Sequence, residues 1–280
     1  MSPLETFLSA REIWAVPLSA SLLAGALLGF LGVYVVLRRI VFVSAALTQI
    51  STLGLVVTLL VEERFHVETE HASEQLTVAM AFSVVGAILL ATVRPRRLPA
   101  EATVGAAWVS ASALVVLGVS FLVHAAHDLG GMIFGNAVAV PAADLWVIAI
   151  VTGAFALVHT LFEKEIRFAS FDPETARALG VNVRLWDALL YVMLGLSIPA
   201  TARALGALPV FALLTLPASA ALLLGLRLRA VLALATVIGI VAAGGGYVAS
   251  WLLEVPTGAT MVALAGAFLL PGLALRAARG

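Results

Sequence analysis

The sequence contains no cysteine and few charged residues. Charged side chains make up 11% of the 280 residues, and 16 basic and 16 acidic residues balance to a net charge of zero. The absence of cysteine excludes a disulfide framework and thiolate metal sites. The absence of a basic excess argues against a nucleic-acid partner. Average soluble domains carry about 25% charged residues, so the scarcity of charge excludes a soluble globular enzyme and a disordered chain.

Hydrophobic residues make up 62% of the sequence, and the mean hydropathy is +1.11. A spanning helix needs roughly 20 mostly apolar residues, and nine runs are candidates. They are Ile13–Leu37, Val41–Val61, Leu76–Val93, Ala102–Val123, Leu145–Phe162, Ala188–Thr201, Val210–Leu226, Val231–Leu253 and Thr257–Leu275. The sixth is short enough to be a broken or half-spanning element. We therefore expect an all-α polytopic membrane protein of eight or nine spans, forming one domain over residues 1–280.

The basic residues predict the orientation in the membrane. Thirteen of the 16 lie in alternate loops between the runs, and the positive-inside rule places such loops in the cytoplasm. They are Arg38, Arg39, Arg94, Arg96, Arg97, Lys164, Arg167, Arg177, Arg184, Arg227, Arg229, Arg276 and Arg279. In a cell (inner) membrane, the N-terminus would then lie outside and the C-terminus in the cytoplasm.

The longest polar segment between the runs is a predicted cytoplasmic loop at about 163–187. Within it, Asp172 precedes Pro173, which suits the first position of a helix, and Glu174 follows in the first turn. Gly180 can end that helix. Two interpretations stay open, an ordered surface loop and a docking helix for a cytoplasmic partner. The expected helix would present a small apolar surface formed by Ala176, Leu179 and Val181.

The sequence has no phosphate-binding G-x-x-x-x-G-K-[ST] loop, so this chain is not expected to hydrolyse nucleotides. Energy for uphill transport would have to come from another chain or an ion gradient. A gradient-driven transporter is the weaker option, because the apolar runs contain almost no acidic residues.

The segment SFDPETARALGVNVRLWD, residues 170–187, resembles the coupling loop of the ABC-3 family of metal-ion permeases. Further segments resemble that family in the same order, and together they cover most of the chain from Leu37 to Leu270. They are LRRIVFVSAALTQISTLG, LPAEATVGAAW, IFGNAVAVPAADL, and ARALGALPVFALLTLPASAA followed by PTGATMVALAGAFLL.

This resemblance implies the transmembrane permease subunit of an ABC importer for zinc, manganese or iron, with an architecture like that of the vitamin B12 permeases. It implies a homodimer above two cytoplasmic ATPase subunits, which would bind ATP and magnesium, and an external solute-binding protein that delivers the ion. No cofactor is expected on this chain itself. The implied coupling helix comprises Asp172, Pro173, Glu174, Ala176, Arg177, Leu179 and Gly180.

The sequence departs from the family in the second span. There the family carries a Gly-Asp-x-Leu-x-His pattern, whose carboxylate and imidazole suit a divalent cation. The aligned residues here are Ala45 and Gln49, so both ligands are missing. The remaining face of Ala45, Thr48, Gln49 and Thr52 either packs against other helices or lines a weakly polar pathway. A permease with a non-metal cargo, or a non-transporting sensor or scaffold, is therefore the alternative to a metal importer.

Other candidate residues lie near the predicted outer surface. His66, His71, His124 and His127 are weak candidate metal ligands, and solvated loops are the alternative explanation. Arg203 near the outer end of the sixth run either snorkels to the interface or pairs with an outer acid. His159 lies inside a span, where it is either a functional residue or a neutral imidazole bonded to a backbone carbonyl. The glycines at 25, 29, 32 and 244–246 suggest close helix contacts or hinges.

Overall fold

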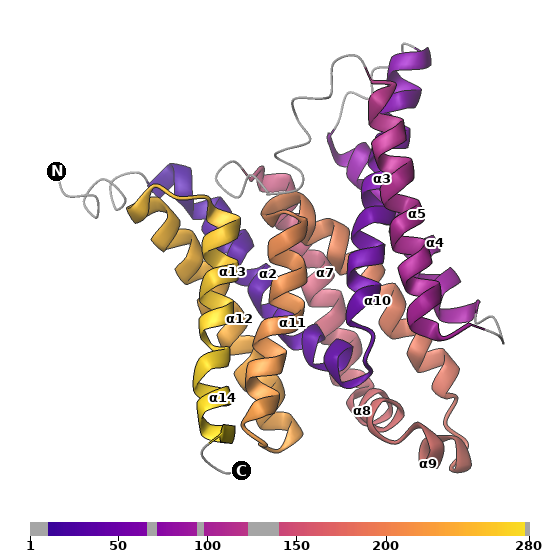
Figure 1. Cartoon of the computed structure of the whole chain (residues 1–280), viewed down its shortest axis with the longest axis vertical. Coiled ribbons are helices and arrows are strands. Elements are labelled where there is room, and N and C mark those ends of the chain that lie inside the picture. Colours follow the sequence, from indigo (N-terminus) through magenta and orange to yellow (C-terminus); the bar gives the residue numbers. More distant parts are fainter. Residues whose placement is uncertain (1–10, 66–71, 94–97, 123–139, 278–280) are drawn as a thin grey trace. The chain divides into compact units, whose positions relative to one another are not determined.

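The structure is a computed structural model that describes residues 11–65, 72–93, 98–122 and 140–277, and regular structure in these ranges is entirely helical (Figure 1). The helices are α2 (Arg11–Leu37), α3 (Val41–Phe65), α4 (Ala72–Thr92), α5 (Ala100–Ser120), α7 (Ala142–Leu161), α8 (Glu163–Phe171), α9 (Pro173–Ala178), α10 (Val183–Leu205), α11 (Ala207–Leu223), α12 (Leu228–Leu253), α13 (Thr257–Ala267) and α14 (Leu269–Ala277).

Within these ranges, eight helical segments are long and apolar enough to cross a membrane, and α11 is a shorter apolar helix. The expectation of an all-α protein with eight or nine spans is therefore confirmed. Large apolar side chains on α5 and α7 are exposed, among them Val116, Trp146 and Ile150. Such continuous apolar surface is typical of helices that face lipid or another protein rather than water.

The chain folds into two compact units. One contains residues 1–39, 130–152 and 201–280, and the other contains residues 40–129 and 153–200. The boundary between the units falls within α7 and α10, because residues 142–152 of α7 and 201–205 of α10 belong to the first unit and the remainder of each helix to the second. The prediction of a single continuous domain stays a prediction.

The first unit is built around a close contact between α2 and α12. A Cβ atom added at Gly25 would overlap the carbonyl oxygen of Gly239, and one added at Gly29 would lie 2.5 Å from the carbonyl oxygen of Ala235. Contacts move backward along α12 as they advance along α2, so the two helices are antiparallel. Small residues four positions apart on both helices let the backbones approach. The predicted role of these glycines as helix-contact positions is confirmed.

In the second unit, α3 packs against both α4 and α5. Gly54 of α3 meets the side chain of Phe82 on α4, and a Cβ at Gly54 would lie 2.9 Å from the Phe82 ring. On the opposite side, Val56 forms an apolar cluster with Val115 and Leu122. The helix that carries the candidate pathway residues is thus held on two sides.

The sixth apolar run is longer in the structure than the sequence indicates, and the prediction that it is broken or half-spanning is wrong. Helix α10 extends over Val183–Leu205, which is 23 residues. Its first five residues include Arg184 and Asp187, whose charge obscures the start of the span in the sequence. The side chain of Asn182 begins the helix, because its Oδ1 accepts a hydrogen bond from the Leu185 amide at 3.3 Å.

The short apolar helix is instead the seventh, α11, with 17 residues. At 1.5 Å per residue it reaches about 25 Å, less than the roughly 30 Å hydrocarbon layer. The last predicted span is divided into α13 and α14 at Phe268. Pro271 accounts for this break, because it has no amide hydrogen to donate to the carbonyl of Ala267.

Candidate functional site

The predicted cytoplasmic loop contains two helices, α8 and α9, where the sequence predicts one. Helix α8 is stabilised by an ion pair between residues one helical turn apart, in which Arg167 Nη1 lies 2.6 Å from Glu163 Oε1. It buries Ile166 and Ala169 on one face. The i, i+4 spacing of Glu163 and Arg167 is a signal that could have predicted this helix.

Helix α9 begins where the sequence predicts. Asp172 is its N-cap and accepts a hydrogen bond from the Thr175 amide at 3.0 Å, and Pro173 occupies the first turn. Hydrogen bonds from the Thr175 side chain and backbone hold the pKa of the exposed Asp172 carboxyl below its ordinary value, because they stabilise the charged form. The regular helix ends at Ala178, and Gly180 then reverses the chain with a φ of +83°. Only glycine adopts this conformation at no steric cost.

The underside of α9 is fixed to its neighbours by an apolar cluster. Ala176 is fully buried and packs with Ala169 of α8 and Val183 of α10, while Val181 and Trp186 surround them. The expectation that Ala176 and Val181 form an exposed apolar surface is therefore wrong. Helix α9 is too short to be stable alone, and the cluster turns its apolar side inward against α8 and α10.

Exposed apolar and charged side chains lie together on the segment from the end of α8 to the end of α9. The apolar ones are Phe171 and Leu179, of which Leu179 is 69% exposed, and the charged ones are Glu174 and Arg177. We call these four residues the α9 face. Phe171 ends α8, Glu174 and Arg177 lie on α9, and Leu179 follows it, so all four belong to the segment that the apolar cluster holds against α8 and the start of α10.

We expect the substitution Asp172→Ala to loosen α9 without unfolding the protein. The Thr175 amide loses its acceptor, and the first turn should fray. Hydrogen exchange should accelerate at the first-turn amides of α9 and stay unchanged in α12. In the wild-type protein the cap should persist at neutral pH and be lost as the pH falls through the lowered pKa of Asp172. Unchanged exchange in the variant would contradict this role.

The candidate pathway residues lie together on α3. Thr48 is buried, whereas Ala45, Gln49 and Thr52 are partly exposed. The Thr48 hydroxyl donates to the Ser44 carbonyl at 2.8 Å, and the Thr52 hydroxyl donates to the Thr48 carbonyl at 3.0 Å. Both hydroxyl hydrogens are thus used within the helix, and the oxygens remain as acceptors. The face offers neutral oxygen atoms and no charge.

The other candidate ligands receive less support. His66, His71, His124 and His127 lie outside the described residues. In the ranges that are described, no three His, Asp or Glu side chains converge as a metal site would require. His159 is buried in α7, with its ring centroid 6.0 Å from that of Phe155 one turn earlier.

One ion pair of the structure could not be predicted from the sequence. Arg203 Nε lies 3.1 Å from Asp144 Oδ2, and the Asp144 side chain is 7% exposed. Of the two interpretations of Arg203, pairing with an acid is the one the structure supports. Sequence reasoning missed Asp144 because it stands at the start of an apolar run and has no local basic neighbour. The pair connects the first turn of α7 with the last turn of α10.

Comparison with known proteins agrees with this arrangement. The chain is 28% identical over 249 residues to the manganese transport system membrane protein MntC of Halalkalibacterium halodurans, covering 89% of this chain and 82% of that protein. It is 29% identical over 268 residues to the manganese transport system membrane protein MntD of Bacillus subtilis, covering 91% and 88%.

Among solved structures, the fold resembles a chain of PsaBC from Streptococcus pneumoniae in complex with Fab. The TM-score is 0.81 at 22% identity, over 96% of this chain and 95% of that chain. The model of the ABC 3 transport family matches residues 11–276. The apolar helices, the capped helix after the fifth span and this match together show that the chain is a multi-pass membrane protein that belongs to the ABC 3 transport family.

Proposed function

We propose that this chain is the permease subunit of an ABC importer for divalent metal ions, with manganese as the first candidate. The manganese transport proteins MntC and MntD, to which it is similar over about nine-tenths of its length, support this cargo. The observation that carries the permease role is the α9 face, presented by a capped helix that packs onto the start of a span.

In the proposed mechanism, two cytoplasmic ATPase subunits bind the α9 faces of two permease subunits. The second permease subunit is a copy of this chain. Phe171 and Leu179 would enter an apolar groove of the ATPase, and Glu174 would pair with a charge at its rim. Closure of the ATPases would then move α9 together with α8 and α10. An external solute-binding protein would deliver the ion from the opposite side.

Co-purification with the candidate ATPase tests the coupling role. We expect Leu179→Asp to abolish both ATPase association and metal uptake, because the exposed leucine would be replaced by a charge that the groove would have to desolvate. Leu226→Asp is the matched control, since Leu226 is an exposed leucine in another loop predicted to be cytoplasmic. Equal association of the two variants with the ATPase would refute the coupling role.

The candidate pathway residues on α3 bear on how the metal ion would cross the membrane. A divalent cation prefers carboxylate or imidazole ligands to neutral hydroxyl and amide groups. The Gln49 side chain is partly exposed, so its carboxamide oxygen can act as a weak ligand. We propose that the ion crosses this region weakly held, between neutral oxygen atoms.

This proposal predicts the effect of restoring the two charged ligands. The double variant Ala45→Asp/Gln49→His should take up manganese faster at subsaturating concentration, by about tenfold if the new ligands add about 1.4 kcal/mol of affinity. Uptake of radioactive manganese into proteoliposomes that contain the full importer measures it. Equal uptake by the wild type and the double variant would show that the two substitutions do not weaken transport.

A non-transporting sensor or scaffold remains the second candidate, favoured by the absence of charged ligands at Ala45 and Gln49. It predicts that the binding protein stimulates ATP hydrolysis in proteoliposomes while no metal enters. Metal uptake by the wild-type complex would exclude it.

A further inference from the structure

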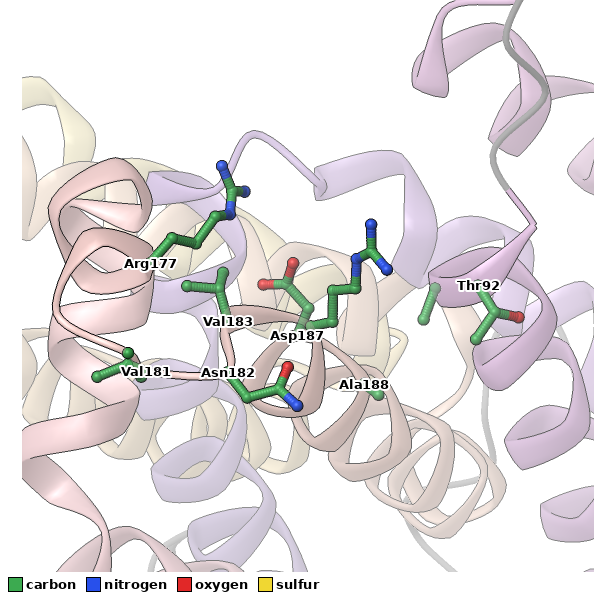
Figure 2. A pocket seen from close by; sticks show the side chains of 10 residues that line it. Thr92, Arg177, Val181, Asn182, Val183, Asp187 and Ala188 are labelled. Carbon is green, nitrogen blue, oxygen red and sulfur yellow. The ribbon is translucent and has the colours of Figure 1, made fainter.

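A cavity of about 990 Å³ lies in the second unit beside the end of α9 (Figure 2). Residues from the end of α4, the end of α9 and the start of α10 line it. Figure 2 shows Arg177 and Thr92 on opposite sides of the cavity, with Asn182 and Asp187 between them. The α9 face does not account for this cavity, because only Arg177 belongs to both.

The cavity lies at the level where two spans end. Thr92 is the last residue of α4, and Val183 is the first residue of α10. Both helices are candidate membrane spans. Their ends mark the boundary between the hydrocarbon layer and the polar headgroups. This level is on the side that the basic loops predict to be cytoplasmic.

The lining of the cavity favours an anion. It includes two guanidinium groups, from Arg177 and Arg184, against one carboxylate from Asp187. Both arginine side chains are exposed and extend from elements that the apolar cluster holds together. Because Asn182 Oδ1 accepts from the Leu185 amide, its Nδ2 group remains as a donor. Guanidinium groups with an amide donor are typical ligands of phosphate oxygens.

The face of α4 below the cavity is apolar and uncovered. Ile88 lies one turn before Thr92 on α4, so it shares the helix face that lines the cavity. The Ile88 side chain is 42% exposed. A ligand that carries both an anionic headgroup and acyl chains would contact the arginines and this isoleucine together.

We infer that this cavity is a binding site for the headgroup of an anionic phospholipid. The phosphate is held by Arg184 and Arg177, and an acyl chain lies along Ile88. Free phosphate would use the same arginines but would leave Ile88 uncovered. The site borders the end of α9, so an occupied site ties that end to the membrane surface. The inference needs only that the chain spans a membrane, and it is independent of the proposed cargo.

Lipid retention by the purified full-length chain tests this inference. Native mass spectrometry in detergent would compare phosphatidylglycerol with phosphatidylcholine, each added at the same molar ratio. The wild type should retain phosphatidylglycerol preferentially. Arg184→Gln should lower that preference about fivefold, the effect of one basic residue near an anionic surface, and Arg184→Lys should restore most of it. Arg227→Gln removes an exposed arginine from the first unit and should change nothing.

Several results would overturn the inference. One is equal retention of the two lipids by the wild type, and another is an Arg184→Gln variant that keeps the preference for phosphatidylglycerol. A third is displacement of the lipid by millimolar inorganic phosphate, which would identify free phosphate as the ligand. A fourth is an Arg184→Gln variant that retains lipid normally but binds the ATPase more weakly, which would assign the surface to the protein partner. Thermal unfolding without added lipid should be the same for all variants, because Arg184 lies on the surface.

Discussion

Replacing Gly25 by leucine is expected to prevent this protein from accumulating in folded form. The backbones of α2 and α12 touch at this point, and even a Cβ atom at Gly25 would overlap the carbonyl oxygen of Gly239 and lie 2.8 Å from the Cβ of Ala243. Neither obstacle is the flexible end of a side chain, so the helices would have to separate. Overpacking a rigid contact costs about 1–3 kcal/mol for small changes, and leucine adds four carbon atoms. The free energy of unfolding should fall by more than about 3 kcal/mol.

Size-exclusion chromatography of detergent extracts and thermal unfolding would measure this effect. Gly25→Ala should be milder, because the clash is partly offset by the roughly 1 kcal/mol by which alanine favours a helix over glycine. Gly105→Ala is the matched control, since a Cβ at Gly105 of α5 would meet nothing within 4 Å. That variant should gain up to about 1 kcal/mol. Equal unfolding temperatures for Gly25→Leu and Gly105→Ala would contradict the close packing of α2 against α12.

Removing Arg203 is expected to cost almost as much stability. Arg203→Leu leaves the carboxylate of Asp144, whose side chain is 7% exposed, without its 3.1 Å partner. Breaking one half of a buried ion pair costs about 3–5 kcal/mol. The Arg203 side chain is 26% exposed, and water can therefore reach part of the pair. We expect the lower end of that range, about 3 kcal/mol.

A double-mutant cycle separates the pair from the packing of its side chains. Asp144→Leu/Arg203→Leu should be more stable than Arg203→Leu alone, because no charge is left buried. The Glu163–Arg167 pair is the control, since its side chains are about one-third exposed. Arg167→Gln should cost no more than about 0.5 kcal/mol. A double variant less stable than either single variant would show that the two residues act independently.

The fold class and the capped helix α9 could be predicted from the sequence, because both depend on local features. A run of apolar residues forms a helix in a bilayer whatever its neighbours are, since backbone groups there must be satisfied within the segment. The Asp172–Pro173 cap is equally local, and the hydrogen bond to Thr175 confirms it. The same local features gave a wrong prediction for α10, because Arg184 and Asp187 near its beginning hid the start of a span.

The sequence by itself thus determined that this protein crosses a membrane as a set of helices and carries a short capped helix between two of them. Only the tertiary structure decided which side of that helix is buried, because Ala176 and Val181 are oriented by contacts with α8 and α10. It also decided that Arg203 pairs with Asp144 and that Arg177 and Arg184 line one cavity. Each of these arrangements brings together residues from different helices. Periodicity and spacing describe one helix at a time, whereas such contacts depend on how helices pack.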